Sequence, residues 1–307
     1  MAQEVAIAEP GILPIGNYLH FRWDEVRENA FDEWVFPGNG RPYGDCGTYF
    51  TKGCLDHIPA FVKKIRVSCR RSECPLCAMP PRSNDGKSYK TWIVEATRRI
   101  KHRIKAGRPR SGRRRRPIHI SINPAPDLWP KFIGKDGYGK MRRKAGRVAK
   151  KAGFNGGCLI FHPYREKKPD KLWYWSPHFH AIGYGWIVNT AEISRDTGFV
   201  VKNHRVRESI GATAYYQLSH AGVKYGHRVI SWIGDLAWNS EVGKRIPKMK
   251  AELELCPICE GMLYPVEWKG GGDNPLSDHG ACELQLPDPT GWVYVGTNVG
   301  YLGEVIE

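Results

Sequence analysis

Residues His178 to Trp186 read HFHAIGYGW and predict a β-strand. Side chains on a strand alternate between the two faces of its sheet. His178 and His180 therefore point the same way, while Phe179 points into the core behind them. Two neutral imidazoles side by side are a usable ligand pair for a divalent cation. Taken alone, an H-x-H pair is equally compatible with two surface histidines or two hydrogen-bonded core histidines.

The segments around this strand predict an α+β fold. Alternating or apolar patterns predict further strands at 117–123, 157–162, 199–201 and 228–233, and helical spacing predicts helices at 88–106, 138–152 and 209–221. This order describes an antiparallel sheet with helices on one side.

The last predicted helix contains a tyrosine pair in the segment AYYQLSH, residues 214–220. Tyr216 and His220 are four residues apart, so they share one helix face. A tyrosine hydroxyl is a competent nucleophile when a nearby metal polarises its target. His220 is a candidate third ligand for that metal. Tyr215 faces another way and is the alternative nucleophile, although an ordinary amphipathic helix with a core tyrosine also fits the pattern.

The charge of the chain points to a polyanionic partner. Lys plus Arg total 47 and Asp plus Glu total 31, which gives a formal net charge of +16. The cations are concentrated in RRIKHRIKAGRPRSGRRRR at 98–116 and in KMRRKAGRVAKK at 140–151. No amphipathic helix with an exposed aromatic face accompanies them, so nucleic acid is favoured over an acidic membrane. The candidate DNA-binding residues are Arg113, Arg114, Arg115, Arg116, Arg142 and Arg143.

The nine cysteines indicate bound zinc in a reducing compartment better than disulfides. The segment CRRSECPLC contains Cys69, Cys74 and Cys77, and these predict a zinc site together with Cys54; Cys46 or His57 are alternates. A second turn, Cys256-Pro-Ile-Cys259, is expected to take His279 and Cys282 as partners, at the spacing of a zinc ribbon. Both sites are expected to be structural, and Cys158 is expected in the core. The alternative for all of them is reduced cysteines that pack as small hydrophobes.

An ordered series of these motifs resembles a known superfamily. SPHFHAIGYGW at 176–186, AYYQLSHAG at 214–222 and SWIGDL at 231–236 look like the HUH (His-hydrophobe-His) endonucleases, and in particular like rolling-circle replication initiators of archaeal plasmids and viruses. IHISIN at 118–123, IFHPYR at 160–165 and the two cysteine clusters also resemble that group. The resemblance covers most of residues 46–265. One departure is that the lysine common a few residues after the family's tyrosine is absent here.

The resemblance implies a chemistry. His178 and His180, with His220, would hold Mg²⁺ or Mn²⁺ in an HUH/RRM-like nuclease core. Tyr216 would nick single-stranded origin DNA, leaving a 5′-phosphotyrosine link and a free 3′-hydroxyl for rolling-circle replication with host replication proteins. The alternatives are an HUH transposase or relaxase with the same chemistry, hydrolysis by metal-activated water, and a non-enzymatic zinc-finger protein that binds nucleic acid.

The sequence also suggests an organisation into four regions. We expect an irregular zinc-binding region at 1–78, a basic helix and arginine-rich linker at 79–116, the nuclease core at 117–245 and a zinc-ribbon-like region at 246–307. No apolar run approaches the length of a membrane helix, and no secretory signal is evident. A cytoplasmic protein without a membrane partner is therefore expected, while its oligomeric state stays open.

Overall fold

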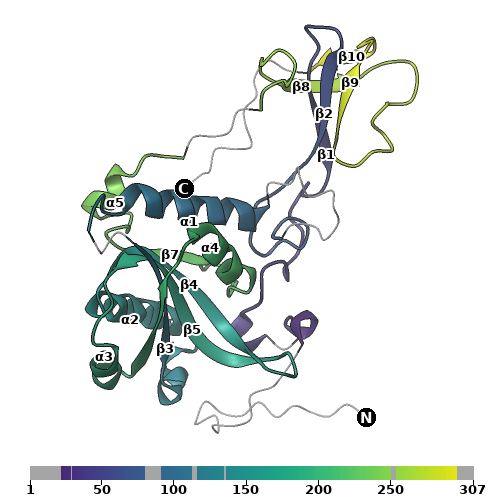
Figure 1. Ribbon diagram of the computed structural model, residues 1–307. Helices are drawn as coiled ribbons and strands as arrows, with labels where there is room; N and C mark the ends of the chain where they lie inside the picture. Colours follow the sequence, from purple (N-terminus) through teal and green to yellow (C-terminus); the bar gives the residue numbers. More distant parts are fainter. Residues whose placement is uncertain are drawn as a thin grey trace, which may run out of the picture. The chain divides into compact units, whose positions relative to one another are not determined.

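The computed structural model (Figure 1) describes residues 22–28, 30–79, 91–112, 116–134, 136–249 and 254–295. The chain divides into two compact units. Unit 1 takes residues up to Arg41 together with Ile93–Lys248, and unit 2 takes Pro42–Trp92 together with residues from Met249 onward. No helix within these ranges combines the length and apolar character needed to cross a membrane.

Unit 1 is built on a five-stranded antiparallel sheet in the order β6-β3-β5-β4-β7. The strands are β3 (Pro117–Pro124), β4 (Phe154–Lys167), β5 (Leu172–Gly185), β6 (Phe199–Val206) and β7 (Ile230–Gly234). β5 contains the segment HFHAIGYGW and lies at the centre. Its Gly183 lies against β4 so closely that a β-carbon there would come within 2.1 Å of the Gly156 carbonyl oxygen.

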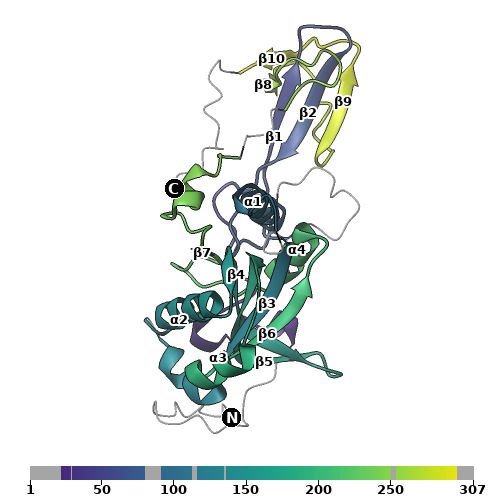
Figure 2. The same ribbon diagram turned by 60° about the vertical axis from the view of Figure 1, so that its left-hand side comes forward.

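Helices cover both faces of this sheet, whereas the sequence predicted helices on one side only. The helices are α1 (Trp92–Gly107), α2 (Gly137–Lys151), α3 (Thr190–Thr197), α4 (Ile210–Ser219) and α5 (Glu241–Arg245). Figure 2 shows α2 and α4 on opposite sides of the strands. Phe179 of β5 packs in the core beneath α2. Side chains alternate along the strand, so His178 and His180 lie on the opposite face, where His162 is hydrogen-bonded to the Gln217 carbonyl of α4.

The core beneath α2 is apolar throughout. Ile118, Ile120 and Ile122 of β3 pack there with Phe179, and helical residues such as Met141 cover them. An intervening side chain of β3, such as His119, therefore points to the opposite face. Every strand predicted from the pattern lies where expected, but β4, β5 and β6 are longer, and α3 was missed because its polar sequence has one buried residue, Ile193.

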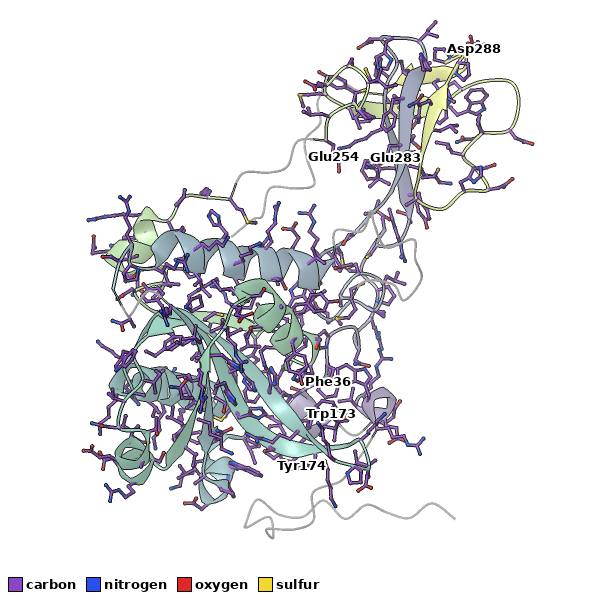
Figure 3. All side chains as sticks on the ribbon, viewed as in Figure 1. Phe36, Trp173, Tyr174, Glu254, Glu283 and Asp288 are labelled. Atoms are coloured by element: carbon purple, nitrogen blue, oxygen red, sulfur yellow. The ribbon has the colours of Figure 1, made fainter. Side chains whose placement is uncertain are left out.

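The described residues before Arg41 contribute to this core. Trp34 and Phe36 are fully buried in it, and a β-bridge joins Val35 to Val223. The Phe36 ring meets the ring of Trp173 of β5 edge-on at 4.8 Å, and Figure 3 shows the two side chains next to each other. This segment is therefore part of unit 1 and not of a zinc-binding region.

Unit 2 contains a second antiparallel sheet in the order β10-β8-β1-β2-β9. Its strands are β1 (Tyr49–Cys54), β2 (Ala60–Arg66), β8 (Tyr264–Trp268), β9 (Cys282–Leu286) and β10 (Trp292–Tyr294). The β1–β2 hairpin comes from the first half of the chain, and β8, β9 and β10 come from its end.

The structure thus divides the chain differently from the four regions expected. The two cysteine-rich regions form one unit because β8 and β9 pair with the two outer edges of the β1–β2 hairpin. Residues 93–107 of the basic helix α1 belong to unit 1, where Ile93, Ile100 and Ile104 are buried.

Candidate metal and nucleophile site

One face of the unit 1 sheet, which we call the histidine face, carries five histidines. They are His119 of β3, His162 of β4, His178 and His180 of β5, and His204 of β6. Strand register brings them together: His162 pairs with His178, and Ser121 pairs with both His180 and Lys202. Four neighbouring antiparallel strands, β6, β3, β5 and β4, thus supply imidazoles to one face.

His162, His178 and His180 form a compact group. Their nearest ligand nitrogens all lie within 4.8 Å of one another. The ring centroid of His162 lies 5.2 Å from that of His178 and 4.5 Å from that of His180. Such a group can hold a metal ion, and we call His162, His178 and His180 the metal group. His162 was not among the ligands predicted from the sequence, although the motif IFHPYR that contains it is adjacent to β5 through the β4–β5 pairing.

Backbone carbonyls fix the protons of two of these imidazoles. Nε2 of His162 lies 2.9 Å from the Gln217 carbonyl oxygen, and Nδ1 of His178 lies 2.7 Å from the Ser176 carbonyl oxygen. A carbonyl only accepts, so each of these nitrogens carries the proton. The other nitrogen of each ring, Nδ1 of His162 and Nε2 of His178, therefore keeps a lone pair, as a metal ligand requires.

Burial keeps these rings neutral. His162 is 1% exposed and His178 is 5% exposed. Burial, followed by the repulsion of neighbouring histidines, lowers the pKa of His162, His178 and His180 well below the usual value. Neutral imidazole is the form that binds metal.

His220 and Tyr216 lie beside the group. The His220 ring centroid is 4.4 Å from that of His162 and 4.9 Å from that of Tyr216. Helix α4 ends at Ser219, and His220 is its C-cap, yet the contact expected from the four-residue spacing is present. Burial lowers the pKa of His220 to about 4.

The two tyrosines differ in exposure. The Tyr216 side chain is 65% exposed, and its hydroxyl makes no hydrogen bond within the described residues. Tyr215 is half-buried. Within the metal group the structure places His162 with His178 and His180, and His220 stands between this group and Tyr216. The strand residue His162 is thus grouped with the predicted pair, and His220, the ligand candidate from the sequence, lies next to that group.

His119 and His204 extend the cluster away from α4. Nε2 of His119 lies 2.7 Å from Nδ1 of His180, and the His119 and His204 rings stack with centroids 4.5 Å apart. These two residues and His180 form a second group with ligand nitrogens within 4.8 Å of one another. The 2.7 Å separation is a hydrogen-bond distance, whereas two nitrogens bonded to one metal at about 2.1 Å stand roughly 3 Å or more apart. The second group is therefore better suited to hydrogen bonding than to metal.

The structure describes three of the six arginines predicted to bind DNA. Arg113, Arg114 and Arg115 lie outside the described residues, and Arg116, just before β3, is exposed. Arg143 is exposed on α2, and Arg142 is half-buried and donates to the Ser231 hydroxyl at 3.2 Å. Helix α2 covers the sheet face opposite the histidines, so any contact of Arg142 or Arg143 with DNA is separate from the metal group.

Unit 2 brings Cys46, Cys69, Cys74 and Cys77 together, with ligand atoms within 4.8 Å of one another. The Cys69 and Cys77 sulfurs are 3.3 Å apart, and those of Cys74 and Cys46 are 3.6 Å apart. Four sulfurs around zinc at ~2.3 Å would stand ~3.8 Å apart, so a small adjustment suffices. The group can hold a structural metal such as zinc.

The predicted member Cys54 is not in this group. β1 and β2 are antiparallel, with Tyr49 opposite Arg66 and Cys54 opposite Phe61. Cys46, before β1, and Cys69, after β2, therefore lie at the same end of the hairpin. Cys54 lies at the other end, roughly 15 Å or more away at ~3.3 Å per residue.

The second thiolate group forms at that other end. Cys54, His57, Cys256 and Cys259 have ligand atoms within 4.8 Å of one another, and Nε2 of His57 lies 3.2 Å from the Cys256 sulfur. β8 pairs with β1 beside Gly53 and so carries the Cys256 turn to this position. The group can likewise hold a structural metal such as zinc.

The predicted partners His279 and Cys282 take no part in this second group. Cys282 is in β9 opposite Lys64, partway along the hairpin, and packs against apolar side chains. His279 is exposed, and its carbonyl oxygen accepts a hydrogen bond from Lys64. Loop spacing alone had suggested them, and the second group contains Cys54 and His57 in their place. Cys46, which was one of the alternates for the first site, takes the place of Cys54 there. Cys158 is fully buried in β4, as expected.

Comparisons of the chain with protein-family models, with curated proteins and with solved structures find no match.

Proposed function

We propose that this protein is a metal-dependent DNA-nicking enzyme in which Tyr216 attacks a phosphodiester of single-stranded DNA. The observation that carries the proposal is the group His162, His178 and His180, three neutral imidazoles with nitrogens within 4.8 Å, beside an exposed tyrosine. His220 connects the two, since its ring contacts both His162 and Tyr216.

The donor set narrows the choice of cation. Mg²⁺ prefers oxygen ligands, and imidazole suits transition metals better. The three proposed ligands are all imidazoles, so Mn²⁺ is the better candidate of the two cations expected. His180 can serve through Nε2 if its Nδ1 proton is donated to Nε2 of His119, 2.7 Å away.

The proposed reaction is a transesterification. A divalent cation bound here would withdraw charge from the nonbridging phosphate oxygens. The Tyr216 oxygen forms a bond to phosphorus and its proton is lost to solvent. The bond from phosphorus to the 3′-oxygen breaks, and that oxygen takes up a proton from solvent. The products are a 5′-phosphotyrosine and a free 3′-hydroxyl. The number of phosphoester bonds is unchanged, so the nick can be resealed without ATP, and the 3′-hydroxyl can prime a polymerase.

These products suit a replication initiator of the rolling-circle type, acting on origin DNA with host replication proteins. A transposase or relaxase would use the same chemistry on other DNA. The two cysteine groups would then hold zinc structurally, and the net charge of +16 would support DNA binding.

Incubation of the full chain with single-stranded DNA labelled at its 3′ end and with Mn²⁺ tests the proposal, because the fragment on the 3′ side of the cut is the one that stays on Tyr216. We expect cleavage with one labelled fragment attached to the protein. His178→Ala and His180→Ala should abolish cleavage and leave DNA binding nearly intact. Cleavage with no attached fragment would indicate hydrolysis by water, and binding with no cleavage would indicate a zinc-bearing nucleic-acid-binding protein; either result overturns the proposal.

A further inference from the structure

Three cations lie on the histidine face in addition to the imidazoles. Arg165 is on β4, Lys202 is on β6, and Arg207 directly follows β6. After burial, the charges of Arg207, Lys202 and Arg165 lower the pKa of His204, so all three act on one ring. We call Arg165, Lys202 and Arg207 the cation cluster.

The two guanidinium groups of the cluster have neutral partners only. Arg165 donates from Nη2 to the side-chain oxygen of Asn123, and Nη2 of Arg207 lies 3.3 Å from Nδ1 of His119. Within the described residues neither arginine forms an ion pair, and the Nε atom of each is buried without a hydrogen-bond partner. A buried charged donor that lacks an acceptor is costly, so an acceptor from outside the chain would be stabilising.

Lys224, another cation of unit 1, is paired with acidic side chains. The Lys224 ammonium is largely buried and lies 3.0 Å from a carboxylate oxygen of Asp32 and 3.3 Å from one of Glu33. No carboxylate is among the groups that shift the pKa of His119, His178 or His204. Among the residues that the structure describes, acidic side chains therefore neutralise the Lys224 ammonium, whereas the cation cluster has no acidic partner.

We propose that the cation cluster binds a phosphodiester of single-stranded DNA, with the Arg165 and Arg207 guanidinium groups as its hydrogen-bond donors. The planar fork of a guanidinium matches phosphate oxygens, and such charge-assisted bonds are among the stronger ones in proteins. Arg165 also acts on His178, whose pKa its charge helps to lower, so the cluster borders the metal group.

The hydrogen bonds of His119 add to this argument, which here rests on the proposed function. If His180 binds a metal through Nε2 and donates from Nδ1 to His119, the neutral His119 ring carries its own proton on Nδ1. The Arg207 guanidinium then has no acceptor on His119 and can donate to an oxygen of a bound phosphate. The cluster would thus hold a phosphate beside the one that is attacked.

Binding of an oligothymidylate to the Tyr216→Phe chain, without added divalent cation, tests this inference apart from nicking. Arg165→Gln and Arg207→Gln should each weaken binding about tenfold. Each should also reduce the slope of log affinity against log salt by about 0.7, the value for one phosphate contact on a single strand. The matched control is Arg195→Gln, which removes an exposed arginine from α3; we expect its affinity and slope to stay near the parent's.

Arg165→Lys keeps the positive charge and provides a second test if the Arg165→Gln variant fails to fold. This variant should show the parent's slope of log affinity against log salt but only part of its affinity. An ammonium carries the charge but lacks the planar set of donors of a guanidinium. If both Gln variants fold and bind like the Arg195→Gln control, the inference is wrong even if nicking is observed. If the losses appear but the chain nicks no DNA, the phosphate site stands and the proposed function fails.

Discussion

At the scale of single residues, the account depends on which imidazole completes the metal group. His178 and His180 could be read from the sequence because strand alternation places them on one face. His162 could not, because its position depends on the pairing of β4 with β5, which brings it opposite His178. His220, the expected ligand, instead contacts both His162 and Tyr216.

Substitution of His162 tests which of the two histidine groups binds the metal. His162→Ala should weaken Mn²⁺ binding by more than about a hundredfold, which exceeds the usual effect of residues that only orient ligands. His204→Ala, the matched control from the second group, should weaken it by much less. Isothermal titration calorimetry, with thermal melting to check folding, measures both. If His204→Ala weakened Mn²⁺ binding more than His162→Ala, the metal would instead be bound by His119, His180 and His204.

The buried histidines also give the protein a pH-dependent stability. Burial lowers the pKa of His220 to about 4, against an ordinary value near 6.5. Between these values the unfolded chain binds a proton that the folded chain does not, so the free energy of unfolding falls as pH drops from about 6.5 to 4. Urea unfolding should show a smaller fall over this window for His220→Gln than for the parent. An equal fall in the free energy of unfolding for the two proteins would contradict the lowered pKa of His220. Any metal bound by the cysteine groups is common to both proteins, so its loss at low pH would cancel in the comparison.

At the scale of secondary-structure elements, the β1–β2 hairpin organises unit 2. One cysteine group lies at its open end and the other at its turn, and β8 brings the Cys256 turn beside Cys54. A hydrogen bond from the Leu55 amide to the Tyr294 hydroxyl, at 2.6 Å, joins this turn to β10. Each metal would thus link segments that are distant in the sequence.

Zinc content tests this arrangement. We expect two zinc ions per chain, one for each cysteine group. Cys46→Ser and Cys54→Ser should each lower the content to about one, because each removes a ligand from a different group. Cys282→Ser is the matched control and should leave it unchanged. Elemental analysis by mass spectrometry of the purified variants gives these numbers. A loss of zinc on substitution of Cys282 would favour the ribbon spacing suggested by the sequence.

The elements of unit 1 could largely be predicted from the sequence, whereas the grouping of elements could not. Periodicity identified α1, α2, α4 and the strands, since each buries an apolar stripe. It could not show that α1 and α4 cover one face of the sheet and α2 the other. The grouping of the cysteines differs from the expected one for the same reason. Cys46 precedes β1 and Cys54 is its last residue, and sequence spacing does not show which end of this strand lies near Cys69.

At the scale of the whole molecule, two observations support the same functional hypothesis. They are the net charge of +16 and the exposed Tyr216 near three neutral imidazoles. Exposed basic residues such as Arg143 on α2 lie on the sheet face away from the histidines, whereas the cation cluster borders the metal group. Each unit also has its own core: the unit 2 sheet packs around residues such as Val62 and Leu286.

The identity of the DNA-linked residue tests the central claim most directly. The full chain is incubated with Mn²⁺ and a single-stranded DNA library of mixed sequence, treated with nuclease and protease, and its peptides are examined by mass spectrometry. We predict a nucleotide joined through its 5′-phosphate to Tyr216, absent in Tyr216→Phe and retained in the matched variant Tyr215→Phe. Cleaved DNA with no modified peptide, or a nucleotide on any other residue, would contradict the account.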